Sequence, residues 1–263
     1  AAARPGRRAR VLRRAPALDL DGLRNTHPIY TTVRTPDDAN ANFDVITYEK
    51  GASVVRMIER YLGEAAFRRG VRHYIKKHRE SNAVASDLWQ ALEEASGESV
   101  EPVVRTWIET PGFPVVSVQK RKTQRRVLLE LRQERFTEAP PREPKPRAQS
   151  WPVPWVGRVG RRTQRHLLKK RMERIELLEP SAKVVYGNAD EAGFFRVQHG
   201  EHEHAELIAN PSRLSVAERI GWVGHQWALT RTGRASIASL LEIAHTLADD
   251  NDPDVLTAVE RPL

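Results

Sequence analysis

The sequence contains no cysteine, which excludes disulfide bonds, thiolate nucleophiles and cysteine-ligated zinc or iron–sulfur sites. Aromatic residues make up only 6% of the 263 residues. No apolar run approaches the roughly 18 residues that a membrane-spanning helix needs. The first 14 residues hold six arginines, but the apolar core of a secretory signal does not follow them. We therefore expect a cytoplasmic protein that does not enter a membrane.

Apolar residues still make up 40% of the chain, enough for hydrophobic cores, and this excludes wholesale disorder. Positive charge is in excess, with 43 Lys and Arg against 34 Asp and Glu, and it concentrates in residues 119–147 and 158–174. Such segments can attract nucleic acid, but these two lack interleaved aromatic platforms for stacked bases. We attribute most of the excess to a general bias toward arginine and do not expect nucleic acid to be a partner.

The spacing of apolar residues is helical from about residue 43 to 109. Ser86 is a plausible N-cap there, Pro102 fits a first helical turn, and Pro111-Gly112 breaks the pattern. The pattern predicts four helices: over 48–62, through Phe67–Ile75, between Ser86 and Gly97, and through Val103–Ile108.

From Phe113 the period of the apolar residues drops to two, which is typical of strands. A proline-rich segment over 140–146 predicts a loop between them. A β-sandwich of about 85 residues fits this spacing. The predicted strands lie at Val116–Val118, Val127–Leu131, Trp151–Val156, 172–178, Lys183–Tyr186 and Phe194–Val197.

The helical period returns near Ser212, and Ser215 with Glu218 forms a capping box. Two helices are predicted, through Val216–Trp227 and Ile237–Leu247, followed by a turn and a short apolar stretch. We interpret Trp107 and Trp227 as core aromatics. Two helices cannot close a core alone, so we expect this last unit to be incomplete.

Five segments in the same order along the chain resemble the M1 family of zinc aminopeptidases. The longest is Phe43-Asp44-Val45-Ile46-Thr47-Tyr48-Glu49-Lys50-Gly51-Ala52-Ser53-Val54, which is similar to the family pattern F-D-x-I-x-Y-x-K-G-A-x-V. One such match is weak, but five in family order form a strong resemblance. The other four are Thr26–Ile29, Asn82-Ala83 with Asp87–Trp89, Trp107 with Pro111–Val116, and Asn188–Val197.

The resemblance implies a multi-domain α+β architecture. A basic N-terminus over 1–25 stays unassigned. Residues 26–111 would be the helical C-terminal part of a thermolysin-like catalytic domain, and 112–199 a β-sandwich. Residues 200–263 would be the truncated beginning of an α-helical domain.

The resemblance also implies that Tyr48 is a catalytic residue. Zinc peptidases need a metal that polarises the carbonyl, a carboxylate base, and a donor to the tetrahedral oxyanion. In the M1 family a tyrosine is that donor, and Tyr48 matches its position. Asp44, Glu49 and Lys50 are assigned positioning or packing roles. Gly51 and Ala52 are small, which would let the helix approach a substrate cleft.

No zinc ligand is identified in this chain. None of the nine histidines begins the H-E-x-x-H motif that carries two zinc ligands and the general base. The nearest sequence, His202–Glu206, has Glu206 where the second histidine should stand. His199, His202 and His204 could bind a metal, but we interpret them as part of a solvated loop. Zinc is thus expected for the parent family, with its ligands outside this chain.

Two interpretations follow from this resemblance. In the first, the chain is a fragment of an aminopeptidase that removes N-terminal residues from peptides, and it is inactive alone. In the second, it is a non-catalytic scaffold, or half of a split enzyme whose partner chain carries the zinc motif. Side-chain preference and oligomeric state are not determined by these residues.

Overall fold

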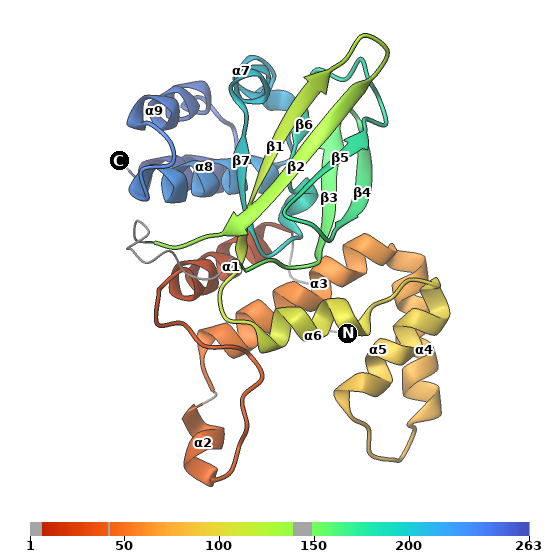
Figure 1. Cartoon of the computed structure of the whole chain (residues 1–263). Helices are drawn as coiled ribbons and strands as arrows, with labels where there is room; N and C mark the ends of the chain where they lie inside the picture. Colours follow the sequence, from red (N-terminus) through yellow and green to blue (C-terminus); the bar gives the residue numbers. More distant parts are fainter. Residues whose placement is uncertain (1–6, 42, 139–148, 263) are drawn as a thin grey trace.

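The computed structural model describes residues 7–41, 43–138 and 149–262, so most of the predicted proline-rich loop lies outside the described residues. Within these ranges the protein is a mixed α/β structure with two small sheets (Figure 1). The elements of its first part are α1 (Arg7–Asp21), α2 (Pro36–Ala41), a π-helix (Ile46–Lys50), α3 (Gly51–Leu62), α4 (Glu64–Lys77), α5 (Ala85–Ser96) and α6 (Glu101–Glu109).

The four predicted helices of this part are confirmed as α3 to α6. Gly63 ends α3 with a φ of 87°, a backbone conformation that glycine adopts without strain. The prediction that Ser86 caps α5 is wrong, since Val84 is the N-cap and its N–H donates to the Asp87 carboxylate at 2.8 Å. Helix α1 lies in the segment to which the sequence analysis assigned no structure.

In the described part of the chain, seven strands form the two sheets. Sheet order is β5-β2-β1-β7 in one and β4-β3-β6 in the other. In the first sheet, β1 pairs antiparallel with β2 on one side and parallel with β7 on the other. The strands are β1 (Pro114–Lys122), β2 (Val127–Arg135), β3 (Val153–Val159), β4 (Arg162–Leu168), β5 (Met172–Glu176), β6 (Val185–Tyr186) and β7 (Arg196–His199).

Strand β4 was not predicted, because it lies in the basic segment 158–174, where the apolar alternation is interrupted. It pairs antiparallel with β3, from Val153 opposite Leu168 to Val159 opposite Arg162. It has one neighbour in its sheet, so its other edge can carry charged side chains that remain in water.

One hydrophobic core joins the two sheets to α3, α5 and α6. Trp107 of α6 is fully buried in it, as predicted, and its Nε1–H donates to the Pro152 carbonyl at 2.9 Å. In Figure 1, α3 to α6 lie together below the strands, and α7 to α9 lie beside them. The core therefore fixes the helical part against the sheets.

The C-terminal helices are α7 (Glu201–Ala209), α8 (Val216–Arg231), α9 (Ile237–Thr246) and α10 (Pro253–Glu260). The predicted capping box is confirmed, as the Ser215 N–H donates to Glu218 Oε2 at 2.8 Å and the Glu218 N–H to Ser215 Oγ at 3.4 Å. Helix α10 replaces the predicted turn and apolar stretch. Trp227 is only partly buried, so its interpretation as a core residue is wrong. Trp222 is buried instead, in a second hydrophobic cluster that includes residues of α7 to α10. None of the described helices has the length and apolarity to span a bilayer.

Candidate functional site around Tyr48

Tyr48 lies in the π-helix that leads into α3. Such widened turns are uncommon and often occur at functional sites. Its side chain is 56% exposed and packs against the ring of Phe43, with centroids 5.7 Å apart. The Tyr48 N–H donates to the Asp44 carbonyl at 3.2 Å. The phenol is therefore accessible from outside the described chain instead of being sealed in a core.

The face of α3 next to Tyr48 is open. A Cβ built on Gly51 would meet no atom within 4 Å. A cavity of about 290 Å³ lies along α3 from Glu49 to Glu59, and Arg14 and Glu191 also line it, whereas Tyr48 does not. The expectation that Gly51 and Ala52 let the helix approach a substrate cleft stays a prediction.

A buried lysine anchors the π-helical turn that contains Tyr48. Lys50 is fully buried, and its Nζ lies 2.9 Å from Asp21 Oδ2 at the end of α1. It also donates to the carbonyls of Thr110 and Gly112, at 3.1 Å each, where α6 passes into β1. Burial lowers the pKa of Lys50, and the Asp21 carboxylate opposes that shift. Lys50 thereby ties the Tyr48 turn to two distant parts of the chain.

A histidine–aspartate pair holds the entry of the same turn. Asp44 Oδ1 accepts from the Thr47 N–H at 2.8 Å, and Asp44 Oδ2 lies 2.5 Å from His27 Nε2. His27 Nδ1 lies 2.9 Å from the Pro28 carbonyl, which can only accept, so Nδ1 carries a proton. The Pro28 hydrogen bond, with the Asp44 and Asp21 charges, raises the pKa of His27 against the effect of burial. Both ring nitrogens therefore act as donors when His27 is an imidazolium.

The hold of this pair on Thr47 is expected to depend on pH. Burial raises the pKa of Asp44, but hydrogen bonds from Thr47 and His27 outweigh this effect and bring the pKa below 3.8. The pKa of His27 lies above 6.5. Because its pKa is raised, His27 contributes stability that is complete below pH 6.5 and is lost as pH rises through its folded pKa. Because its pKa is lowered, Asp44 contributes stability that is complete above pH 3.8 and is lost as pH falls through its folded pKa. Both contributions are complete between those two values.

We therefore expect the Thr47 amide chemical shift to follow the protonation of His27 as pH rises above 6.5. The measurement is an NMR titration of the His27 ring and of the Thr47 amide in the same sample. In His27→Gln the high-pH step of Thr47 should disappear, whereas in His73→Gln, a change at an exposed helix position, it should remain. A Thr47 step that persists without His27 would contradict the linkage.

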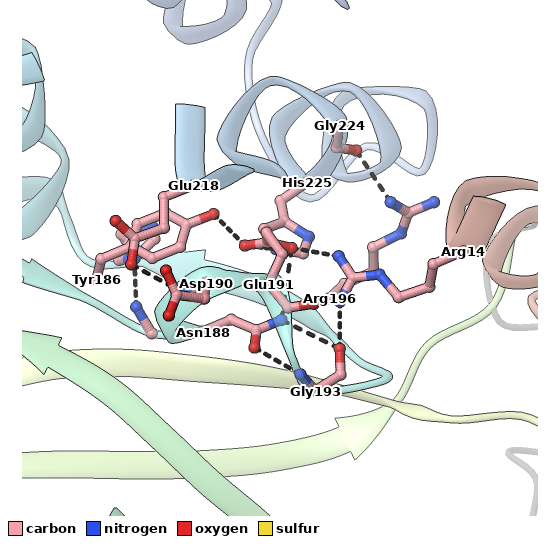
Figure 2. A network of polar contacts seen from close by, with 12 residues as sticks. Arg14, Tyr186, Asn188, Asp190, Glu191, Gly193, Arg196, Glu218, Gly224 and His225 are labelled. Atoms are coloured by element: carbon pink, nitrogen blue, oxygen red, sulfur yellow. Dashed lines mark hydrogen bonds and ion pairs between the residues drawn. The ribbon is translucent and has the colours of Figure 1, made fainter. Parts of the chain in front are cut away.

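A second polar network lies away from Tyr48, where the Asn188–Val197 segment meets α1 and α8 (Figure 2). Glu191 is at its centre with a fully buried carboxylate, which accepts hydrogen bonds from Arg14 and from the Tyr186 hydroxyl. His225 Nε2 lies 3.1 Å from Glu191 Oε2. Burial alone would raise the pKa of Glu191, but His225 and Arg14 lower it to about 2.

This network has catalytic residue types, but its side chains are buried and are engaged mainly with one another. Glu191 reaches it through a left-handed backbone, with φ of 53° at Asp190 and 52° at Glu191. A Cβ on Gly221 of α8 would lie 2.1 Å from Glu191 Cδ, so only glycine fits there. The network joins α1, the Asn188–Val197 segment and α8. Sequence reasoning did not single out Glu191 or His225, and only the Asn188–Val197 motif marks the region.

The three clustered histidines are not in a solvated loop, so that interpretation is wrong. His199 belongs to β7, and its ring nitrogen accepts from the Gly187 N–H at 3.1 Å. Burial lowers the pKa of His199 to about 3. His202 and His204 lie on α7, where His204 Nε2 is 3.4 Å from Glu242 Oε2. The described residues of the chain include no group of three or more His, Asp and Glu that could hold a metal ion. These residues do not fit a zinc site.

Comparison with known proteins gives a consistent set of relatives. The family model described as the peptidase family M1 domain matches residues 6–107. Tricorn protease-interacting factor F2 of Thermoplasma acidophilum is 36% identical over 239 residues, which are 90% of this chain and 28% of that protein. Puromycin-sensitive aminopeptidase of Caenorhabditis elegans is 35% identical over 254 residues, which cover 94% of this chain and 26% of that protein. Leucyl aminopeptidase of Saccharolobus solfataricus is 35% identical over 236 residues, which cover 90% of this chain and 28% of that protein. The chain thus spans little more than a quarter of the length of these relatives.

Proposed function

Because this chain belongs to the peptidase M1 family, we propose that it is part of an aminopeptidase in which Tyr48 stabilises the oxyanion. The observation that carries the proposal is the exposure of Tyr48, in its family motif, on the open face of the π-helix and α3. A tyrosine hydroxyl is a hydrogen-bond donor that can point at negative charge developing on a peptide carbonyl oxygen. Lys50 and the Asp44–His27 pair are proposed to position it.

The rest of the reaction is proposed to come from other parts of a longer protein, or from a separate chain that carries the zinc motif. Those parts would supply the metal ligands and the general base. In this proposal residues 26–111 complete a thermolysin-like domain, 112–199 form a β-sandwich, and 200–263 begin a helical domain. The peptide substrate would bind between Tyr48 and the zinc-bearing part.

Replacing Tyr48 with phenylalanine in the longer enzyme is expected to lower kcat by about 10²–10³-fold, because one oxyanion donor is worth about 3–4 kcal/mol. KM should change far less, since the interaction forms mainly in the transition state. The measurement is hydrolysis of aminoacyl-nitroanilides. Tyr30→Phe is a suitable control, because Tyr30 is also exposed, at 63%, but lies outside the motif. An unchanged kcat in Tyr48→Phe would remove the role assigned to the phenol.

A non-catalytic scaffold is the alternative, and the lack of an H-E-x-x-H motif in these 263 residues favours it. The isolated chain, stripped of metal and then given zinc, is expected not to cleave the same substrates. Cleavage would contradict the proposed need for a zinc-bearing part. An H-E-x-x-H sequence in the coding region upstream would favour the enzyme, whereas its absence there would favour the scaffold.

A further inference from the structure

A second cavity lies between α1, α8 and α10, away from Tyr48. Its volume is about 210 Å³, and helix α10, which was not predicted from the sequence, contributes to its wall. Four of its lining residues are arginines, and several others are apolar. The arginines are Arg14, Arg196, Arg231 and Arg261; the apolar residues used below are Leu18, Ile220, Val223 and Trp227.

Two of the arginines are buried and each leaves one donor without a partner. Arg14 and Arg196 are both only 5% exposed. The Nη atoms of Arg14 donate to Glu191 and Gly193, and those of Arg196 to the Gly224 carbonyl and the Asp19 carboxylate, as Figure 2 shows in part. The Nε atoms of both are buried and have no hydrogen-bond partner among the described residues. Unmade hydrogen bonds of this kind cost about 1–3 kcal/mol each, so the described residues do not fully satisfy these two buried guanidinium groups.

The charges around the cavity favour an anion. Asp19 is the one acidic residue among the described lining residues, and it is shared between Arg196 at 2.9 Å and Arg231 at 3.5 Å. Arg231 has a further partner in Glu138, at 3.0 Å. Burial, with the neighbouring charges of Arg14 and Arg231, lowers the pKa of Arg196 to about 10 in spite of Asp19 and Glu138. Four arginines and one carboxylate of the described residues thus line the cavity.

The apolar part of the wall indicates the rest of the ligand. Leu18 comes from α1, while Ile220, Val223 and Trp227 come from successive turns of α8. The Arg231 guanidinium lies 5.4 Å from the centroid of the Trp227 ring, which leaves an aromatic surface beside the cations. Inorganic ions would not use this apolar wall, whereas an organic anion would bury a hydrocarbon group against it.

We propose that this cavity binds a small carboxylate that carries an apolar side group, with the carboxylate at the arginines and the side group against Leu18, Val223 and Trp227. This site is separate from the proposed peptidase site. It does not depend on Tyr48 or on a zinc-bearing part, so it can be tested on the 263-residue chain itself.

The test is a titration of the ¹⁵N-labelled chain with N-acetyl-leucine, followed by NMR. We expect saturable shifts at the Gly221 and Gly224 amides, and no saturable shifts with N-acetyl-leucinamide, which lacks the charge. Arg261→Gln should weaken binding about tenfold, a charge-assisted contact of about 1.4 kcal/mol. Arg213→Gln removes the same charge at an exposed position that does not line the cavity, and should bind as the unchanged chain does.

Four results would overturn the proposal. The first is no saturable shift at the cavity amides with N-acetyl-leucine at tens of millimolar. The second is equal binding of the amide, which would remove the role of the arginines. The third is inorganic phosphate binding as tightly as N-acetyl-leucine, which would remove the role of the apolar wall. Unchanged affinity in Arg261→Gln, in a variant with an intact spectrum, would likewise exclude the assigned orientation.

Discussion

Replacing Lys50 with methionine is expected to lower the free energy of unfolding by about 3–5 kcal/mol, because it leaves a buried carboxylate without its cation. Lys50 is fully buried and 2.9 Å from Asp21, which still accepts from the Thr26 hydroxyl at 2.6 Å and the Gly112 N–H at 2.8 Å. The carbonyls of Thr110 and Gly112 also lose the Lys50 donor. Urea denaturation followed by circular dichroism measures the loss.

A double variant separates the charge from the packing. Adding Asp21→Asn to Lys50→Met removes the unpaired charge, so the double variant should be more stable than the sum of the two single losses predicts. Lys76→Met, at an exposed position of α4, is the control and should change stability by less than about 0.5 kcal/mol. Strict additivity of the two buried changes would contradict a direct ion pair between Lys50 and Asp21.

Replacing Glu191 with glutamine is expected to cost a similar amount, about 3–5 kcal/mol, for the opposite reason. The glutamine keeps the shape but leaves the buried Arg14 guanidinium without a counter-charge. The Tyr186 hydroxyl can still donate to the side-chain oxygen, so the loss reports mainly the charge. Glu176→Gln is the matched control, because Glu176 is 65% exposed and pairs with Arg126 at 3.6 Å. Such a surface pair is worth about 0–1 kcal/mol.

The dependence of this loss on pH gives a second, independent test. The pKa of Glu191 falls from 4.5 to about 2 in the folded protein. A lowered carboxyl pKa contributes stability that is complete above 4.5 and is lost as pH falls toward 2. The stability difference between the natural chain and Glu191→Gln should therefore be largest near neutral pH and should shrink below pH 4.5. A difference that stays constant down to pH 2.5 would show that packing, and not charge, causes it.

The Lys50 anchor also bears on the proposed chemistry. Lys50 is two residues from Tyr48, and its three partners come from the end of α1 and from the α6–β1 junction. An oxyanion donor must be held in place before the reaction, since preorganisation is the source of its effect. In this proposal the stability of the Lys50 site and the rate contribution of Tyr48 are linked through one turn of helix.

Features with a local cause could be predicted from the sequence. The period of Val54, Ile58 and Tyr61 predicted α3, and Gly63 marked its end, because both depend on neighbours within a few residues. The Ser215–Glu218 capping box was predicted for the same reason. The resemblance to the M1 family, now supported by the family model and the relatives, also came from short segments that can be read along the chain.

What the sequence alone determined is thus the family, most of the helices and strands, and Tyr48 as the residue to examine. Only the tertiary structure decided which charges are buried together: Lys50 with Asp21, 29 positions away, and Arg14 with Glu191, 177 positions away. It also decided the parallel pairing of β1 with β7 and the cavity beside α10. The physical reason is that burial and electrostatic pairing depend on which surfaces meet, and no spacing within one segment encodes a partner so far along the chain.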